Sequence, residues 1–131
     1  MQSFKELEMS VLRWAEERKI IPNSYPLAQT RKTVEEATEL LEAAAQLRVL
    51  NRLIARDKAL ANHPDVNGLL AESLTAFRDA VGDTVVTLIN ACALADVDLT
   101  ECLSLAYDEI KDRKGTLLPS GVFLKHEASN T

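Results

Sequence analysis

Residues 32–41, KTVEEATELL, and residues 79–90, DAVGDTVVTLIN, decide how this chain folds, because each has helical character and carries a pair of carboxylates. The pairs are Glu36 with Glu39 and Asp79 with Asp83. Residues three or four apart share one face of a helix. Two such helices side by side would bring four acids to one point, which requires cations, and hard oxygen ligands suit Mg²⁺ or Mn²⁺. The pattern predicts a divalent-metal site between helices, with a polyphosphate as its ligand.

Length and composition predict one all-α domain. The chain has 131 residues, a usual size for a single domain, so we expect one domain over residues 1–131. Hydrophobic residues make up 47% of the chain, while Gly and Pro number only 4 each. This balance favours packed helices over a turn-rich β architecture.

Net charge and the N-terminus narrow the classes of partner. The formal net charge of -5 argues against a general nucleic-acid-binding surface, which would need a basic stripe. The first residues, MQSFKELEMS, contain no apolar signal core, and no run of about eighteen apolar residues occurs. We therefore expect a cytoplasmic protein without a membrane partner.

The first half of the chain is predicted to form two helices. Ser3 and Glu6 fit a capping box that opens a helix to about Lys19, and 20–26, IIPNSYP, reads as a loop. A long helix from about Leu27 to Leu60 follows, with a possible break at Asn51. It carries two apolar stripes, one of Val34, Ala37, Leu41, Ala44 and Ala45, the other of Ala43, Leu47, Leu50 and Ile54. Such a helix is expected to lie between neighbours, with Glu36 and Glu39 continuing the second stripe as a buried face.

The second half begins with an expected loop at 62–68 and a helix over about 69–95. From Ala80 onward this helix is apolar nearly all round, and Asp83 is its only charged residue there. A buried carboxylate without a partner is costly, so a cation is expected beside Asp83. Asp79, Asp83 and Asn90 share one face, which makes Asn90 a candidate ligand contact. A hydrogen bond to a neighbouring helix is its ordinary structural alternative.

The last predicted helix opens at Asp98 and Glu101, a second capping box, and is expected to end at Gly115. Lys111, Arg113 and Lys114 fall in its last turn, where the helix dipole favours cations; phosphate binding is the functional alternative. Residues 116–125 are expected to form an extended arm or a small hairpin. Residues 1–3 and 126–131 are expected to fray.

Several of these features also have ordinary explanations. Glutamates one turn apart decorate many solvated helices, so the E-E-x-x-E pattern gains weight only from the apolar continuation of its face and from Asp83. Trp14 and Tyr25 could stack on a base, but Trp14 recurs at core spacing and is expected to pack. Neither His63, in the expected loop, nor His126, near the end, is a convincing catalytic base.

Taken together, the motifs resemble a known family. The matching residues are Gln29-x-x-Lys32-x-x-Glu35-Glu36-x-x-Glu39, then Gly82-Asp83, then Asn90, then Lys111-Asp112-Arg113-Lys114-Gly115. This order resembles the MazG-like branch of the all-α nucleoside triphosphate pyrophosphohydrolases. WAEERKI, AYDEIKDRKG and GVFLK resemble the small single-domain members often encoded by phages and mobile elements, and the likeness runs from about Trp14 to Lys125.

The resemblance implies a metal-ligand set. The family pattern is E-x-x-E, a spacer, then E-x-x-D, and its acids bind the Mg²⁺ that carries the triphosphate. Glu36, Glu39 and Asp83 match, but the remaining glutamate position falls on Ala80. Asp79, adjacent to it and one turn from Asp83, is the candidate substitute. The spacer from Leu40 to Asp79 is long for the family.

The resemblance also implies a reaction and an assembly. Water attacks the α-phosphorus and releases a nucleoside monophosphate and pyrophosphate, with Glu35 or Glu36 orienting the water. Lys111, Arg113 and Lys114 would hold phosphates, and Lys32 would pair with an acid or reach the ligand. Family members assemble as dimers or pairs of dimers, with both subunits at each site.

The sequence thus predicts an all-α bundle of four to five helices, with a four-helix core completed by homo-oligomerisation. The predicted activity is Mg²⁺-dependent pyrophosphohydrolysis of nucleoside triphosphates, with Mn²⁺ as a possible substitute. One alternative is a sister enzyme with a narrow substrate, either deoxyuridine or deoxycytidine triphosphate or a phosphoribosyl nucleotide. Another is a non-catalytic helical dimer that binds a nucleotide or a protein.

Overall fold

The structure is a computed structural model that describes residues 1–127. Within them it confirms the all-α fold class, with one two-stranded sheet. The elements, in chain order, are α1 (Phe4–Glu17), α2 (Ile20–Asn23), α3 (Pro26–Arg56), the 3-10 helix η1 (Lys58–Asn62), α4 (Pro64–Leu94), α5 (Leu99–Ile110), β1 (Gly115–Leu117) and β2 (Phe123–Lys125). Internal contacts divide the described residues into two compact units, residues 1–96 and the residues from Val97 to the end of the described part. A single domain over 1–131 stays a prediction.

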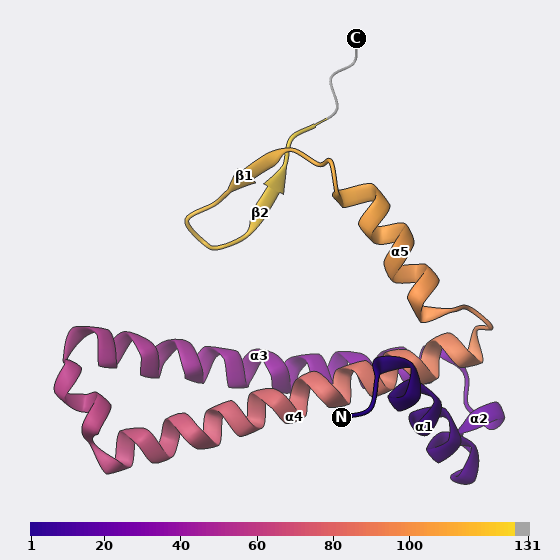
Figure 1. The fold of residues 1–131 in the computed structure, drawn as a ribbon, viewed down its shortest axis with the longest axis horizontal. Coiled ribbons are helices and arrows are strands. Elements are labelled where there is room, and N and C mark those ends of the chain that lie inside the picture. The colour runs from indigo at the N-terminus through magenta and orange to yellow at the C-terminus, as the bar shows by residue number, and fades with distance from the viewer. Residues whose placement is uncertain (128–131) are drawn as a thin grey trace. The chain divides into compact units, whose positions relative to one another are not determined.

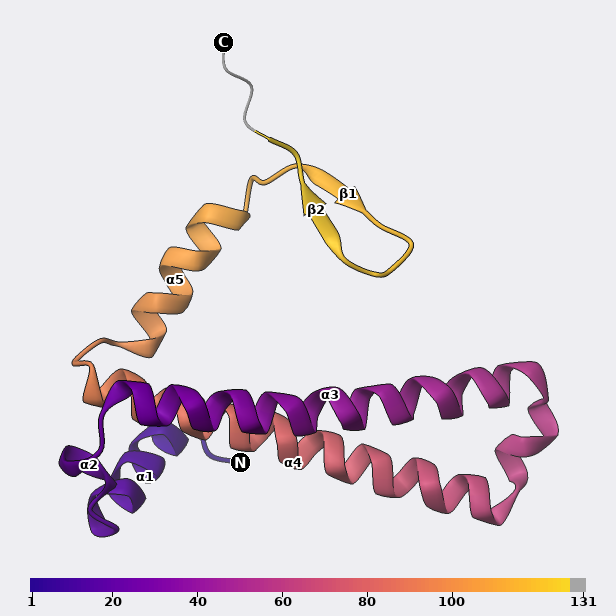
Figure 2. The ribbon, with the colours of Figure 1, turned by 180° about the vertical axis from the view of Figure 1, so that it is seen from behind.

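The long helices α3 and α4 form the body of the first unit. Both are 31 residues long, and they run alongside each other in opposite directions, joined through η1 (Figures 1 and 2). One set of buried positions on each helix recurs every seven residues. The sets are Glu36, Ala43 and Leu50 on α3, and Ser73, Ala80 and Thr87 on α4, where Ile89 and Asn90 are buried as well. Seven residues are close to two helical turns, so each set forms a line along one side of its helix.

The connection between the long helices corrects the predicted loop at 62–68. Pro64 takes the first position of α4, where its missing N–H costs no helical hydrogen bond, and His63 Nδ1 accepts a hydrogen bond from the Asp65 amide at 3.2 Å. Asn67 and Gly68 therefore continue the helix. At the other end of η1, Asp57 Oδ1 accepts from the Ala59 amide at 3.1 Å. Asn51 does not break α3, which is continuous to Arg56.

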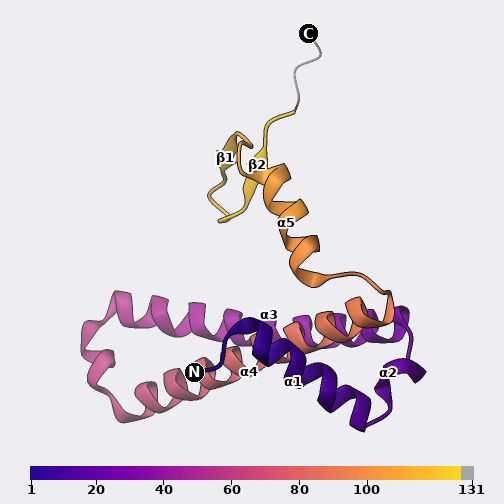
Figure 3. The same cartoon turned by 45° about the vertical axis from the view of Figure 1, so that its right-hand side comes forward.

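The N-terminal helix α1 packs against α4 (Figure 3). Ser3 Oγ accepts a hydrogen bond from the Glu6 amide at 3.2 Å, as the predicted cap requires, and Ala15 is fully buried. The expected loop at 20–26 is partly wrong, because Ile20–Asn23 forms the short helix α2. Lys19, with φ of 61°, turns the chain between α1 and α2.

Of the two apolar stripes predicted on α3, the first unit covers only one. Ala43 and Leu50 are buried, whereas Val34 is 63% exposed and Leu41 is 69% exposed. The prediction that α3 lies between neighbours on both sides is therefore not met within this unit. Val34 and Leu41 form an exposed surface that we call the aliphatic stripe.

In the second unit, α5 is followed by the small hairpin that the sequence predicted. Asp98 caps the helix, its Oδ1 accepting from the Thr100 amide at 2.9 Å. The strands pair antiparallel, with Gly115 opposite Lys125 and Leu117 opposite Phe123. A side chain on Gly115 would collide with the Leu124 carbonyl and the Phe123 ring, so this position requires glycine.

Two predictions for the C-terminal part of the chain are wrong in this unit. The last helix was expected to reach Gly115 but ends at Ile110, so Lys111, Arg113 and Lys114 follow the helix rather than fill its last turn. His126 was expected to fray, but its amide donates to the Lys114 carbonyl at 3.0 Å and its Nε2 lies 3.0 Å from Thr116 Oγ1. Residues 128–131 lie outside the described part.

Within residues 1–127, no single helix is long and apolar enough to span a membrane; α4 and α5 together meet the criteria of length and composition only as a broken pair.

Candidate functional site

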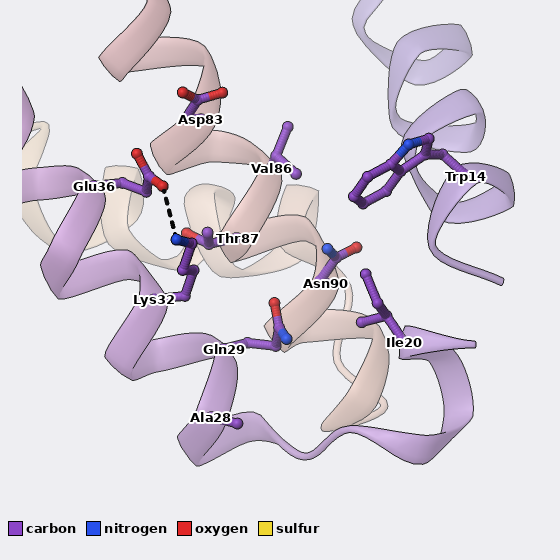
Figure 4. Close-up of a pocket in the computed structure, with 10 residues that line it drawn as sticks. All are labelled: Trp14, Ile20, Ala28, Gln29, Lys32, Glu36, Asp83, Val86, Thr87 and Asn90. Atoms are coloured by element: carbon purple, nitrogen blue, oxygen red, sulfur yellow. Dashed lines mark ion pairs between the residues drawn. The ribbon is translucent and has the colours of Figure 1, made fainter. Parts of the chain in front are cut away.

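The first unit contains a cavity of about 450 Å³ that gathers several of the residues singled out in the sequence. Four helices contribute to it (Figure 4). The lining residues are Trp14, Ile20, Ala28, Gln29, Lys32, Glu36, Asp83, Val86, Thr87 and Asn90. The volume lies within the range of about 300–1,000 Å³ usual for small-molecule sites.

Glu36 is the most unusual group in this cavity. It is buried, with 8% of its surface exposed, on the line that faces α4. Its Oε1 lies 3.4 Å from Lys32 Nζ, whereas its Oε2 is buried and has no hydrogen-bond partner. A buried carboxylate oxygen without a partner carries a desolvation penalty that a cation or a donor would relieve.

Lys32 is shared between two carboxylates. Its Nζ lies 3.0 Å from Glu35 Oε1 as well as 3.4 Å from Glu36 Oε1. Hydrogen bonding to Glu35 raises the pKa of Lys32, with a further contribution from Glu36, so its ammonium form is favoured. Glu35 is exposed and is not among the cavity-lining residues.

Glu39 does not continue the buried face as predicted, because its residue is exposed. Three residues after Glu36, it lies about 60° around the helix from the buried line. The two carboxylates still interact, because the negative charge of Glu36 raises the pKa of Glu39.

The acids of α4 also differ from the expectation. Asp83 lines the cavity, but the residue is exposed rather than buried among apolar side chains. Asp79 is exposed and outside the cavity lining, and Ala80, where the pattern that the motifs resemble has a glutamate, is buried at 3% exposure. Of the four predicted metal ligands, the cavity lining therefore brings together Glu36 and Asp83.

Threonines fix α3 and α4 against each other beside these acids. Thr33 Oγ1 and Thr87 Oγ1 are 2.8 Å apart and share a hydrogen bond. Each hydroxyl is also within reach of a carbonyl of its own helix, 3.0 Å from Gln29 O and 2.7 Å from Thr84 O respectively. The pair therefore links the turn that carries Glu36 to the turn that carries Asp83.

The opposite part of the cavity is more apolar. Trp14 of α1 and Ile20 of α2 face α4, whose Val86 and Asn90 point toward them (Figure 4). Asn90 is 3% exposed and its Oδ1 is buried without a hydrogen-bond partner. An unpaired amide oxygen beside an aromatic wall is suited to a ligand that presents both a donor and a flat apolar face.

Some residues that line this cavity were not predicted from the sequence. Trp14 was expected to pack in the core, but it is 41% exposed, lines the cavity and carries the Arg18 guanidinium 4.6 Å from its ring centroid. Thr87 and Val86 could have been found, because both lie between Asp83 and Asn90 at helical spacing. Ile20 could not be predicted as a lining residue, because its segment was expected to form a loop.

The acids of this cavity do not form a complete metal site by themselves. Within residues 1–127, no group of three or more His, Cys, Asp or Glu side chains is arranged to hold a metal by itself. Mg²⁺, however, is usually held by one or two carboxylates together with water and substrate phosphates. The unpaired Oε2 of Glu36 and the Asp83 carboxylate fit that mode, in which a phosphorylated ligand supplies the remaining oxygens.

The predicted phosphate-binding cations Lys111, Arg113 and Lys114 belong to the second unit. Lys111 Nζ lies 3.5 Å from Asp108 Oδ1 on α5. Their contact with phosphate stays a prediction.

Comparison with known protein families, curated proteins and solved structures finds no match to this chain.

Proposed function

We propose that this chain is a MazG-like, Mg²⁺-dependent nucleoside triphosphate pyrophosphohydrolase and that the cavity of Glu36 and Asp83 is its active site. The observation that carries the proposal is the pair of unsatisfied buried oxygens in one cavity, Glu36 Oε2 and Asn90 Oδ1. One suits a cation and the other a donor on an organic ligand. The hypothesis that the ligand is a nucleotide also rests on the resemblance of the motifs to the MazG-like family.

Magnesium would be held by Glu36 and Asp83. Glu39, one turn from Glu36, and Asp79, one turn from Asp83, are the further candidates. When bound, it would neutralise the phosphate oxygens and make the α-phosphorus more open to attack. Mn²⁺ has the same preference for oxygen ligands and is expected to substitute.

The side chains of α3 would supply binding and proton transfer. Lys32, kept in its ammonium form by two carboxylates, would donate hydrogen bonds to phosphate oxygens. Glu35 or Glu36 would orient the attacking water and accept its proton, while the oxygen forms a bond to the α-phosphorus and the bond to the pyrophosphate oxygen breaks. The products are a nucleoside monophosphate and pyrophosphate.

The apolar end of the cavity would hold the nucleoside. The Trp14 ring and the Ile20 and Val86 side chains offer a surface for a base or sugar, and Asn90 Oδ1 would accept a hydrogen bond from it. The same features serve the narrow-substrate alternative, because an amide that can pair with only some bases discriminates among them.

We propose that self-association of the chain buries the aliphatic stripe. Val34 and Leu41 are more than 60% exposed on a helix that also lines the cavity. Burying such side chains stabilises an interface by roughly 25 cal/mol per Å² of apolar surface. A second copy of the chain would complete the helical core. We also propose a cytoplasmic location.

The non-catalytic alternative has one observation in its favour, which is the buried Ala80 in place of a metal-binding glutamate. Mg²⁺-dependent turnover by the wild type separates it from the enzyme, and Asp83→Asn then tests the assigned site. For the enzyme, this variant loses Mg²⁺-dependent turnover while its helical content and unfolding midpoint stay near those of the wild type. Asp65→Asn, the same charge change at an exposed position of α4, serves as the control. Full turnover in Asp83→Asn would show that the acid is not needed.

A further inference from the structure

A second hollow lies along the last half of α3, away from the cavity described above. It has a volume of about 590 Å³ and shares no lining residue with the first cavity. Arg48, Asn51 and Arg52 of α3 line it together with Phe77 of α4, and the rest of its lining is alanine and leucine. We call it the arginine hollow.

The charge of this hollow is unbalanced. Arg48 and Arg52 are both exposed and stand one helical turn apart, and neither forms an ion pair within residues 1–127. None of the described lining residues is acidic, in contrast to the first cavity. Two guanidinium groups at this spacing repel each other, so an anion between them is favoured.

The helix dipole does not account for these arginines. It favours cations in the last turn of a helix, which in α3 contains Arg56. Arg48 lies two turns before that end, beyond the reach of this effect. Solvated surface charge explains an isolated arginine, but not the combination of two unpaired arginines, an amide and an aromatic wall around one hollow.

We infer that the arginine hollow binds a nucleotide through its phosphate and its base. Arg48 and Arg52 hold the phosphate, with donors that match phosphate oxygens in pairs. Phe77 and the apolar floor receive the base, and Asn51 can hydrogen-bond to its edge or to the sugar. This inference does not depend on catalysis in the first cavity.

The test uses amide NMR of the isotope-labelled full chain titrated with AMP, which lacks the triphosphate cleaved by the proposed activity. We expect saturable shifts at Arg48, Asn51, Arg52 and Phe77. Adenosine and ribose 5-phosphate, each lacking half of the ligand, should bind at least tenfold more weakly. Shifts confined to the first cavity, or none at all, would overturn the inference.

Variants then assign the contacts. Arg48→Ala with Arg52→Ala should weaken AMP binding at least tenfold, whereas Arg31→Ala, an exposed arginine on the same helix, should leave it unchanged. If the double variant does not fold, Arg48→Gln and Arg52→Gln singly are expected to show smaller losses. Unaltered affinity in folded variants would remove the arginines from the site.

A short single-stranded oligonucleotide with a 5′ phosphate forms the second arm of the test. Tighter binding of the oligonucleotide than of AMP at the same amides would assign the hollow to the end of a nucleic-acid strand. Tighter binding of AMP would assign it to free nucleotide. Binding of neither would contradict the inference.

Discussion

The hydroxyl oxygens of Thr33 and Thr87 lie 2.8 Å apart and join the two long helices next to the candidate site. Thr33 is one turn from Glu36, and Thr87 is one turn from Asp83. This hydrogen bond therefore fixes the register in which the two acids line one cavity.

A double-mutant cycle should detect this bond. Valine keeps the shape and the β-branching of threonine but removes the hydroxyl. Because each remaining hydroxyl can still donate to a carbonyl of its own helix, we expect the unfolding free energies of Thr33→Val, Thr87→Val and the double variant to give a coupling of about 0.5–1.5 kcal/mol. Urea titrations measure it, and additive losses would show that the bond does not stabilise the helix pair.

Removing the charge of Glu36 should lower the pKa of Glu39. The negative charge of Glu36 raises the pKa of Glu39, so in Glu36→Gln that carboxyl loses its proton at lower pH. Carboxyl ¹³C titration by NMR measures the change, with Glu17→Gln on α1 as a control of equal charge. An unchanged pKa would mean that the two carboxylates do not interact.

The same substitution should alter the pH dependence of stability. In the folded chain the pKa of Glu39 is above its ordinary value of 4.5. Its contribution to the fold is therefore present below about that pH and is lost as the pH rises through the folded pKa. Glu36→Gln should make the loss of unfolding free energy across this window smaller, as urea titrations at several pH values would show.

Asn90→Leu should separate ligand binding from stability. The buried Oδ1 has no partner in the fold, so its replacement by an apolar side chain of similar size should leave the unfolding free energy unchanged or raise it. Binding of an α,β-imido nucleoside triphosphate with Mg²⁺ should weaken at least tenfold.

Fluorescence of Trp14, the chain's one tryptophan and a lining residue of the cavity, reports this binding. Asn67→Leu, at an exposed position of the same helix, is the matched control. Wild-type affinity with reduced stability in Asn90→Leu would instead make Asn90 a structural residue.

Charged side chains on the aliphatic stripe should dissociate the assembly. Val34→Lys with Leu41→Lys places two ammonium groups where we expect a second copy to pack, and burying them would cost several kcal/mol. Sedimentation velocity should show a shift from oligomer toward monomer. Gln2→Lys with Gln46→Lys adds the same charge at exposed positions outside the stripe and should not shift it. A wild-type chain that sediments as a monomer would contradict self-association.

The helices could be predicted from sequence because periodicity and capping agree in most of them. Ser3 and Asp98 mark helix starts correctly, and Ala43 and Leu50 are buried as their spacing indicates. The predicted loop at Pro64 is wrong, because proline at the first position of a helix is favourable. Four residues at Ile20–Asn23 are too few to show a helical period.

The site was harder to predict, because the side of each helix that meets its neighbour is a tertiary property. Glu36 lies on the line shared with Ala43 and Leu50, so its burial followed from sequence. Glu39 and Asp83 are each three residues from a buried position, which places them about 60° off the buried line. The role of Trp14 in the cavity depends on how α1 packs against α4, which spacing alone does not specify.

The most direct test of the central proposal is product analysis. Wild-type protein is incubated with each ribo- and deoxyribonucleoside triphosphate, with and without Mg²⁺, and the released nucleotide and pyrophosphate are identified. We predict nucleoside monophosphate and pyrophosphate in equal amounts, only when the metal is present. Release of orthophosphate with nucleoside diphosphate, or no release from any triphosphate, would contradict the proposed activity.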